Sequence, residues 1–284
     1  MLKQRVITAI VLLLILGAAM LAPVQWPLLA IFGLLSTLAC WEWQRLSLPA
    51  DQQRWAWPIA ALAGSLIAWL SVYWQIGGLH GQAADLVYRA LVPAIVVAWL
   101  LGATGLVLQG QAQHRAQTAF LCTMGVAAPV AAWAALYALL QGRGVVYVLS
   151  VLVLIWVADI AAYFTGRAFG KAKLAPKVSP GKTWAGAFGG MAAAAAWMVG
   201  SGFWPGSFGA DLVARWGWVA TAVLGVVLAA ISIVGDLFES LLKRRAGVKD
   251  SSQLLPGHGG VYDRIDALLP VAPLALLLGG AWLS

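Results

Sequence analysis

Residues 145–165 read VVYVLSVLVLIWVADIAAYFT, and the only charged residue in this stretch is Asp159. A helix needs about 20 mostly apolar residues to cross the hydrocarbon core of a bilayer, so the stretch predicts a transmembrane helix. An acidic side chain inside such a helix is costly and is either functional or paired with a base. Asp159 is therefore a candidate substrate-binding residue.

The rest of the chain has the same character. Of its 284 residues 62% are hydrophobic and 10% are charged, whereas soluble domains carry roughly 25% charged residues. This composition excludes a soluble globular enzyme and a disordered chain. The predicted fold class is an all-α polytopic membrane protein with about nine transmembrane helices, near residues 6–22, 27–43, 55–76, 86–108, 118–140, 145–165, 184–203, 216–235 and 267–283.

Basic residues are unevenly distributed over the connecting loops. If the N-terminus is cytoplasmic, 15 of the 18 Lys and Arg residues face the cytoplasm, and only Arg89, Arg143 and Arg215 face the other side. This asymmetry follows the positive-inside rule. The net charge of +8 is thereby explained by loop orientation and a phosphate-bearing ligand, without nucleic-acid binding.

Two of the predicted cytoplasmic loops are long and polar. The first, 166–183, ends in Ser-Pro-Gly-Lys-Thr, and the second, 236–266, holds five of the ten acidic residues. Residues 1–144 consist almost entirely of predicted spans and short connectors. We therefore divide the chain into N-terminal transmembrane helices, 1–144, with about five spans, and a C-terminal catalytic region, 145–284, with about four.

The second loop has acidic residues at both of its ends, where it meets the predicted helices. Asp236, Glu239 and Lys243 are spaced so that a helix continuing from the preceding span would present them on one face. Asp263 and Asp266 lie three residues apart, directly before the last span. Carboxylates bind Mg²⁺, and neighbouring Lys and Arg residues neutralise phosphate groups. The pattern predicts a metal-assisted phosphate site at the cytoplasmic face.

These acidic residues also have structural explanations. Glu239 can form an ion pair with Lys243, four residues later. Asp263 can complement the dipole of the last helix, although a dipole explains a second acid, Asp266, and the intervening Arg264 less well.

Glycines surround His258 just ahead of Asp263, at positions 257, 259 and 260. Glycine adopts backbone conformations closed to other residues and lets another group approach the chain closely. We expect Gly259 and Gly260 to allow the approach of a ligand.

The first loop contains Ser179, Lys182 and Thr183 just before a predicted span. The sequence is not a P-loop, because Pro176 stands where that motif requires its first glycine. The N-terminus of the following helix can still offer free N–H groups to a phosphate. The alternative is an ordinary helix cap with positive-inside lysines.

Residues 240–266, SLLKRRAGVKDSSQLLPGHGGVYDRID, resemble the signature of the phosphatidate cytidylyltransferases, also called CDP-diglyceride synthases. The polar segment 159–183 is similar to a second segment of that family. The resemblance is strong over about 155–270 and rests on hydropathy alone before that. Ala185 departs from the pattern, since relatives often carry Glu or Gln there.

The resemblance implies a reaction of CTP with phosphatidate that gives CDP-diacylglycerol and pyrophosphate. It also implies dependence on Mg²⁺, with K⁺ as a candidate second metal. The expected protein is a homodimer in the bacterial inner membrane, surrounded by lipid, with its active site facing the cytoplasm. The attacking group belongs to the lipid substrate, so no protein nucleophile is required.

Carried onto this chain, the resemblance implies roles for Asp159 and for certain polar residues of the two loops, with Lys243, Arg244, Lys249 and Arg264 binding phosphates. The metal ligands would be Asp236 and Asp263, with Glu239 and Asp266 as second choices, and the catalytic set would be Asp236, Asp263, Lys243 and Arg264. The substrate-binding set would be Ser179, Lys182, Thr183, Arg244, Lys249, His258, Gly259, Gly260 and Asp159.

Two other function classes stay open on the sequence. A membrane kinase that phosphorylates a lipid alcohol with CTP or ATP would need a similar metal and phosphate site. A transporter of an anionic solute would place polar residues inside spans of two related halves, but no internal repeat is evident in the chain.

Overall fold

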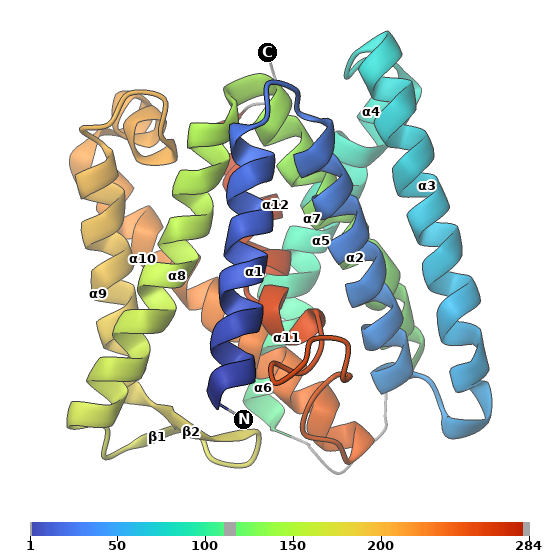
Figure 1. Cartoon of the computed structure of the whole chain (residues 1–284). Coiled ribbons are helices and arrows are strands. Elements are labelled where there is room, and N and C mark those ends of the chain that lie inside the picture. Colours follow the sequence, from blue (N-terminus) through green and yellow to red (C-terminus); the bar gives the residue numbers. More distant parts are fainter. Residues whose placement is uncertain (1, 111–117, 281–284) are drawn as a thin grey trace.

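The structure is a computed structural model that describes residues 2–110 and 118–280. Its long helices lie side by side in a bundle (Figure 1). Their bounds are α1 Leu2–Leu21, α2 Trp26–Ser47, α3 Ala56–Gly77, α7 Thr118–Arg143, α8 Val145–Phe169, α9 Trp184–Ser201, α10 Phe208–Ala246 and α12 Leu268–Gly279. A further helical stretch, Gln82–Gln109, is divided into α4 Gln82–Asp85, η2 Leu86–Leu91, α5 Val92–Val97, η3 Ala98–Ala103 and α6 Thr104–Gln109.

The described residues contain six helical segments that are long and apolar enough to cross a membrane. They are Trp26–Ser47, Ala50–Gly77 (which includes the 3-10 turn η1, Ala50–Trp55), Gln82–Gln109, Thr118–Arg143, Val145–Phe169 and Phe208–Ala246. The chain is thus a multi-pass membrane protein. Helices α1, α9 and α12 occupy the other three predicted spans but are outside this group, so the count of nine stays a prediction. Residues 281–283 of the last predicted span lie outside the described part.

The described chain is mostly helical, as expected, but the first polar loop forms a short β-hairpin that the sequence did not predict. Strand β1, Lys173–Ala175, pairs antiparallel with β2, Ser179–Thr183, with Lys173 opposite Thr183. The run from Ser179 to Thr183 is therefore a strand, and the turn comes before it. Val178 in that turn is 1% exposed and belongs to the hydrophobic core. Burial of this side chain fixes the hairpin against the bundle, which no local pattern in the sequence indicates.

Helices α8 and α9 pack closely through small residues. A Cβ atom on Gly186 would lie 2.8 Å from the carbonyl oxygen of Ala162, and one on Gly190 would lie 2.9 Å from that of Ala158. Small residues at such a contact allow two helix backbones to approach in a membrane. Because α10 also packs against α9, these three helices form one unit of the bundle.

Helix α10 carries the acidic residues of the second loop. It is kinked at Gly217 and then continues without a break past the predicted end at residue 235 to Ala246. The prediction that Asp236, Glu239 and Lys243 lie on a continuing helix is confirmed. A short helix, α11, Tyr262–Ile265, follows the loop and leads into α12.

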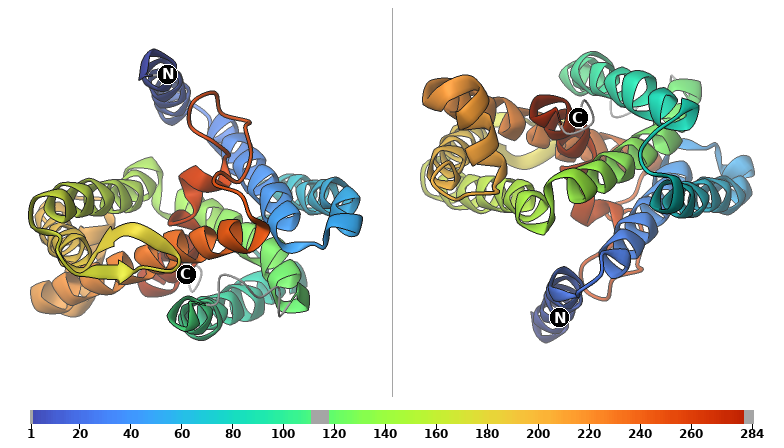
Figure 2. Two further views of the ribbon diagram at one scale, coloured as in Figure 1. Left: turned by 90° about the horizontal axis from the view of Figure 1, so that it is seen from below. Right: turned by 90° about the horizontal axis from the view of Figure 1, so that it is seen from above.

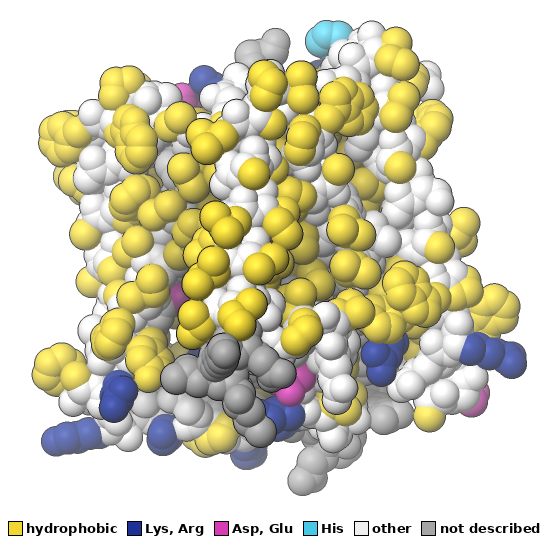
Figure 3. All heavy atoms as spheres, viewed as in Figure 1, with side chains coloured by type: hydrophobic (Ala, Val, Ile, Leu, Met, Phe, Trp, Pro, Cys, Tyr) yellow, Lys and Arg dark blue, Asp and Glu magenta, His cyan; other side chains and the backbone are white. Residues whose placement is uncertain are grey.

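The two polar loops lie at the same end of the bundle (Figure 1). On the face drawn in Figure 3, hydrophobic side chains cover the length of the bundle, and Lys and Arg side chains gather at the end that carries the hairpin. In the end views α1 stands away from the other helices (Figure 2). Its Thr8 hydroxyl donates to the carbonyl oxygen of Pro256 at 3.0 Å, which ties α1 to the second loop.

Candidate active site

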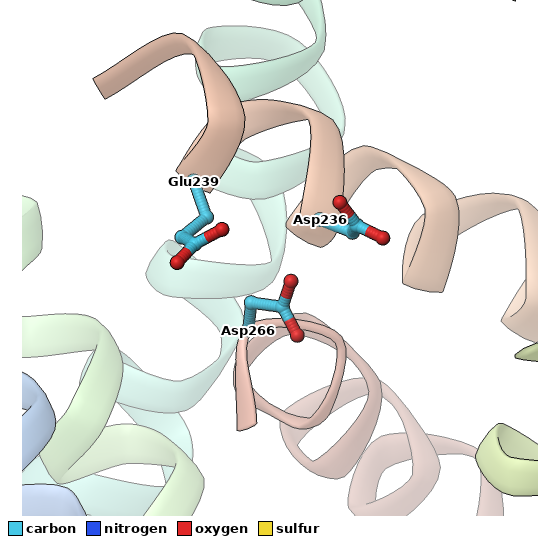
Figure 4. Close-up of side chains that lie close together, drawn as sticks. All are labelled: Asp236, Glu239 and Asp266. Carbon is cyan, nitrogen blue, oxygen red and sulfur yellow. The ribbon is translucent and has the colours of Figure 1, made fainter. Parts of the chain in front are cut away.

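Three carboxylates meet where α10 passes the start of α12. Asp236 and Glu239 come from α10, and Asp266 lies between α11 and α12 (Figure 4). Each offers one oxygen, and these three oxygens lie within 4.8 Å of one another. We call these three residues the acidic cluster.

The acidic cluster has the properties of a cation site. Glu239 is 2% exposed, and its Oε1 atom is buried without a hydrogen-bond partner among the described residues. Burial and the charge of Asp236 raise the pKa of Asp266 well above its ordinary value. Lys182 and Lys243 each contact one member of the acidic cluster, but three close carboxylates, one with an unpartnered oxygen, still repel one another. Oxygen ligands of this kind suit Mg²⁺.

A cavity of about 570 Å³ lies between α8, α9, α10 and the hairpin. Its polar lining includes Asp159, Lys182 and Asp236, and much of the remainder is Ala and Gly. The Lys182 Nζ atom lies 2.5 Å from Oδ2 of Asp236. Asp236 therefore belongs both to the acidic cluster and to the cavity, and Lys182 brings the first polar loop to the second.

Asp263 has different surroundings from the acidic cluster. Its side chain is 5% exposed, and its Oδ1 lies 2.6 Å from Lys243 Nζ. Its Oδ2 accepts hydrogen bonds from the backbone N–H groups of Ser251 (2.9 Å) and Gly260 (2.8 Å) and from the Ser251 hydroxyl (2.8 Å). Groups of the protein thus donate hydrogen bonds to both oxygens of Asp263.

The pKa of Asp263 reflects this supply of donors. Burial alone would raise the pKa, but hydrogen bonds from the Lys243 side chain and from the backbone N–H groups of Gly260 and Ser251 lower it below its ordinary value. The structure thus places Asp266, and not Asp263, beside Asp236. Direct metal ligation by Asp263 stays a prediction.

Lys243 lies between two carboxylates. Its Nζ is 2.6 Å from Glu239 Oε2 and 2.6 Å from Asp263 Oδ1. The structural alternative for Glu239, an ion pair with Lys243, is thus present, and Lys243 also joins Asp263 to the acidic cluster. A phosphate-binding role for Lys243 stays a prediction.

Glu42 on α2 is a buried acidic residue that the sequence reasoning missed. It is 0% exposed. Its Oε1 accepts hydrogen bonds from the Ser252 hydroxyl (2.5 Å) and the Val261 N–H (3.0 Å). Its Oε2 accepts from the Ser251 hydroxyl (2.8 Å) and the Tyr262 N–H (2.6 Å). The sequence contained an indication of this role, because Glu42 lies inside the predicted span 27–43, and an acidic residue inside a span is either functional or paired, as for Asp159.

The glycines beside His258 allow the approach of protein groups. Gly259 has a φ of +84°, and a Cβ atom on it would lie 2.8 Å from Asp263 Oδ2. A Cβ atom on Gly260 would lie 2.5 Å from Glu42 Oε2. The close approach expected for a ligand is thus made by two carboxylates of the chain. Substrate binding by Gly259, Gly260 and His258 stays a prediction.

Two of the arginines expected to bind phosphate donate to backbone carbonyls. Arg244 Nε donates to Val178 at 3.3 Å, which joins α10 to the hairpin, and Arg264 Nη2 donates to His258 at 2.9 Å. Both side chains are exposed, as is Lys249. The structure places all three at the loop end of the bundle, and their phosphate-binding roles stay predictions.

The residues at the end of the hairpin lie close to the cavity. Thr183 caps α9, because its Oγ1 accepts from the N–H of Gly186 at 3.1 Å, which confirms the structural alternative for this residue. Thr183 and Lys182 line the cavity, whereas Ser179 stands at the other end of β2.

Comparison with known proteins adds independent information. Residues 3–281 match the model of a family described as the cytidylyltransferase family. The phosphatidate cytidylyltransferase of Pseudomonas aeruginosa is 42% identical over 99% of each chain. That of Haemophilus influenzae is 50% identical over 131 residues, 46% of this chain and 44% of the relative. That of Brucella suis is 52% identical over 125 residues, 44% of this chain and 43% of the relative.

Proposed function

The chain belongs to the cytidylyltransferase family, and from this premise we propose that it transfers the cytidylyl group of CTP to phosphatidate. The products are CDP-diacylglycerol and pyrophosphate. The names of the three relatives support this activity. The alternative of a lipid kinase has no support from these relatives.

The position of Asp236 is the observation that carries the proposal. It lines the cavity between α8, α9 and α10, and it belongs to the acidic cluster on the other side. A reaction between a lipid phosphate and a nucleotide needs two anionic groups held next to each other. A cavity and a cation site that share one residue meet this need.

The reaction requires little from protein acids and bases. An oxygen of the phosphatidate phosphate attacks the α-phosphorus of CTP and forms a new P–O bond. The bond from the α-phosphorus to the oxygen bridging to the β-phosphate breaks, and pyrophosphate leaves with that electron pair. A phosphate monoester has a second pKa near 6, so the attacking oxygen is already ionised near neutral pH. Lys182, at the wall of the cavity, would donate to a phosphate oxygen.

We further propose that Asp236, Glu239 and Asp266 hold Mg²⁺, with K⁺ as a candidate second metal. The support is the unpartnered Glu239 Oε1 within a group of three close carboxylates. When bound, Mg²⁺ neutralises phosphate charge and makes pyrophosphate a better leaving group. Lys243 and Asp263 would keep Glu239 in position, since they form a chain of contacts with it.

The proposed placement in the cell follows from charge and substrate. The six apolar helices and the bacterial relatives indicate a multi-pass protein of the inner membrane. The excess of Lys and Arg at the loop end supports a cytoplasmic orientation for the active site, where CTP is available. A homodimer stays part of the proposal on the family resemblance alone.

Transfer of a labelled group tests the proposed reaction. Purified protein in detergent is incubated with CTP labelled at the α- or the γ-phosphorus and with phosphatidate or, in a parallel sample, with diacylglycerol as the lipid alcohol that a kinase would need. We expect the α-label in the lipid product and the γ-label in pyrophosphate, and we expect a chelator to stop both. A γ-label in the lipid would identify a kinase, and transfer that resists chelation would exclude the proposed metal site.

A further inference from the structure

We infer that Glu42 on α2 is a positioning residue of the active site, which fixes the second polar loop so that Asp263 and Lys243 hold Glu239 in the acidic cluster. This inference rests on the proposed function. It assigns a role to a helix outside the two polar segments that carry the family resemblance.

The first support is the set of donors around Glu42. A buried carboxylate without partners is strongly unfavourable, yet Glu42 is fully buried. Each of its oxygens accepts one serine hydroxyl and one backbone N–H. All four donors come from the segment 251–262. Glu42 therefore determines the path of that segment over α2.

The second support is a continuous chain of polar contacts. The Ser251 hydroxyl lies 2.8 Å from Glu42 Oε2 and 2.8 Å from Asp263 Oδ2. Because it has a single hydrogen, it is shared between the two carboxylates. Asp263 Oδ1 then contacts Lys243, and Lys243 contacts Glu239, each at 2.6 Å. The chain links α2 to the acidic cluster.

The third support is the tight packing around Glu42. Trp43, the next residue of α2, stacks on Tyr262 with ring centroids 5.1 Å apart and an interplanar angle of 19°. Gly260 has no room for a side chain, since its Cβ atom would lie 2.5 Å from Glu42 Oε2. Two consecutive residues of α2 thus hold the end of the loop, one by hydrogen bonds and the other by aromatic contact.

A residue that orients metal ligands through other groups affects both metal binding and turnover. Loss of such a partner typically costs about 10- to 100-fold in metal affinity or activity. A residue that merely stabilises the bundle would change neither the Mg²⁺ requirement nor the balance of kcat and KM. This difference makes the inference testable.

The first variant is Glu42→Gln. Its amide nitrogen replaces one oxygen and must face the backbone N–H of Val261 or Tyr262, so one of these hydrogen bonds is lost. We expect kcat to fall and the Mg²⁺ concentration for half-maximal rate to rise, each by about 10- to 100-fold, with KM for CTP at saturating Mg²⁺ changed less. Faster amide hydrogen exchange at residues 251–262 gives a readout that does not depend on activity.

Two serine variants distinguish the contact that links Glu42 to Asp263 from a contact that only holds the loop on Glu42. Ser251→Ala removes the hydroxyl shared by Glu42 and Asp263, whereas Ser252→Ala removes a donor to Glu42 alone. We expect Ser251→Ala to shift the Mg²⁺ dependence in the same direction as Glu42→Gln, and Ser252→Ala to shift it clearly less. If Glu42→Gln does not fold, Ser251→Ala decides the question.

Cys40→Ala is the matched control. Cys40 is fully buried on the same helix, and the described residues show no hydrogen bond from it to the loop. We expect lower thermal stability with an unchanged Mg²⁺ dependence. The inference is overturned if Glu42→Gln, or Ser251→Ala in its place, behaves like this control. A wild-type protein that moves no α-label into lipid would instead refute the proposed function.

Discussion

Glu42 and Asp263 are buried acids whose oxygens all receive hydrogen bonds from the chain, whereas Asp236, Glu239 and Asp266 crowd together with fewer donors. The first pair accepts from serine hydroxyls and backbone N–H groups of the second loop. In the second group one buried oxygen has no partner among the described residues.

The difference lies in the supply of donors, since both groups are carboxylates at the same end of the molecule. A carboxylate with protein donors on both oxygens stabilises the fold and has fewer lone pairs free for a cation. A crowded group with few donors is destabilising by itself and gains from a cation. We therefore expect substitutions in the two regions to affect stability and activity differently.

Neutralising Asp236 is the strongest test of the acidic cluster. We expect Asp236→Asn to reduce label transfer by about 10²- to 10³-fold, because the residue serves both the cavity and the acidic cluster. Its melting temperature in detergent should change little, since relief of like-charge repulsion offsets the loss of the partly exposed ion pair with Lys182. Asp51→Asn, at an exposed acid of η1, is the control. A clear loss of stability in Asp236→Asn would end the distinction between the two regions.

Neutralising Asp263 tests the pair of acids, Glu42 and Asp263, whose oxygens all accept hydrogen bonds. In Asp263→Asn, an amide nitrogen takes the place of an oxygen that accepts hydrogen bonds from Lys243 or from the loop. We expect a loss of about 1–3 kcal/mol in unfolding free energy together with a loss of about 10- to 100-fold in turnover. Thermal unfolding and label transfer on the same sample measure both. Inactivity at wild-type stability would place Asp263 among the direct ligands instead.

Two lysines of the hairpin give a smaller contrast. Lys182 contacts Asp236 at 2.5 Å, whereas Lys173 is exposed on β1. We expect Lys182→Gln to lose about tenfold in rate, which matches the weaker end of the range for hydrogen bonds to charged groups. Lys173→Gln should keep the wild-type rate. Equal losses in the two variants would point to a general effect of positive charge.

Addition of Mg²⁺ should produce the smallest effect. A ligand that binds the folded state at three times its Kd stabilises that state by about 0.8 kcal/mol, so the melting temperature of the wild type should rise measurably. Asp266→Asn should lose this rise, and EDTA should reverse it in the wild type. A rise that persists in Asp266→Asn would place the cation elsewhere.

Local patterns in the sequence predicted much of this arrangement. Long apolar runs located the helices, and the spacing of Asp236, Glu239 and Lys243 correctly placed them on one continuing helix. The pattern could not show that Val178 is buried and that the following segment is a strand. It also could not show that Asp263 approaches the backbone at Gly259. Both contacts depend on how the folded loops pack, which a local pattern does not give.

The amino-acid sequence by itself determined the membrane class and the family, because hydropathy and a motif are properties of neighbouring residues. Only the tertiary structure decided which acids are saturated with donors. Glu42 and Ser251 are 209 positions apart and meet through a hydrogen bond, and Lys182 reaches Asp236 from another segment. The surroundings of a carboxylate depend on such contacts, and they form only when the helices pack.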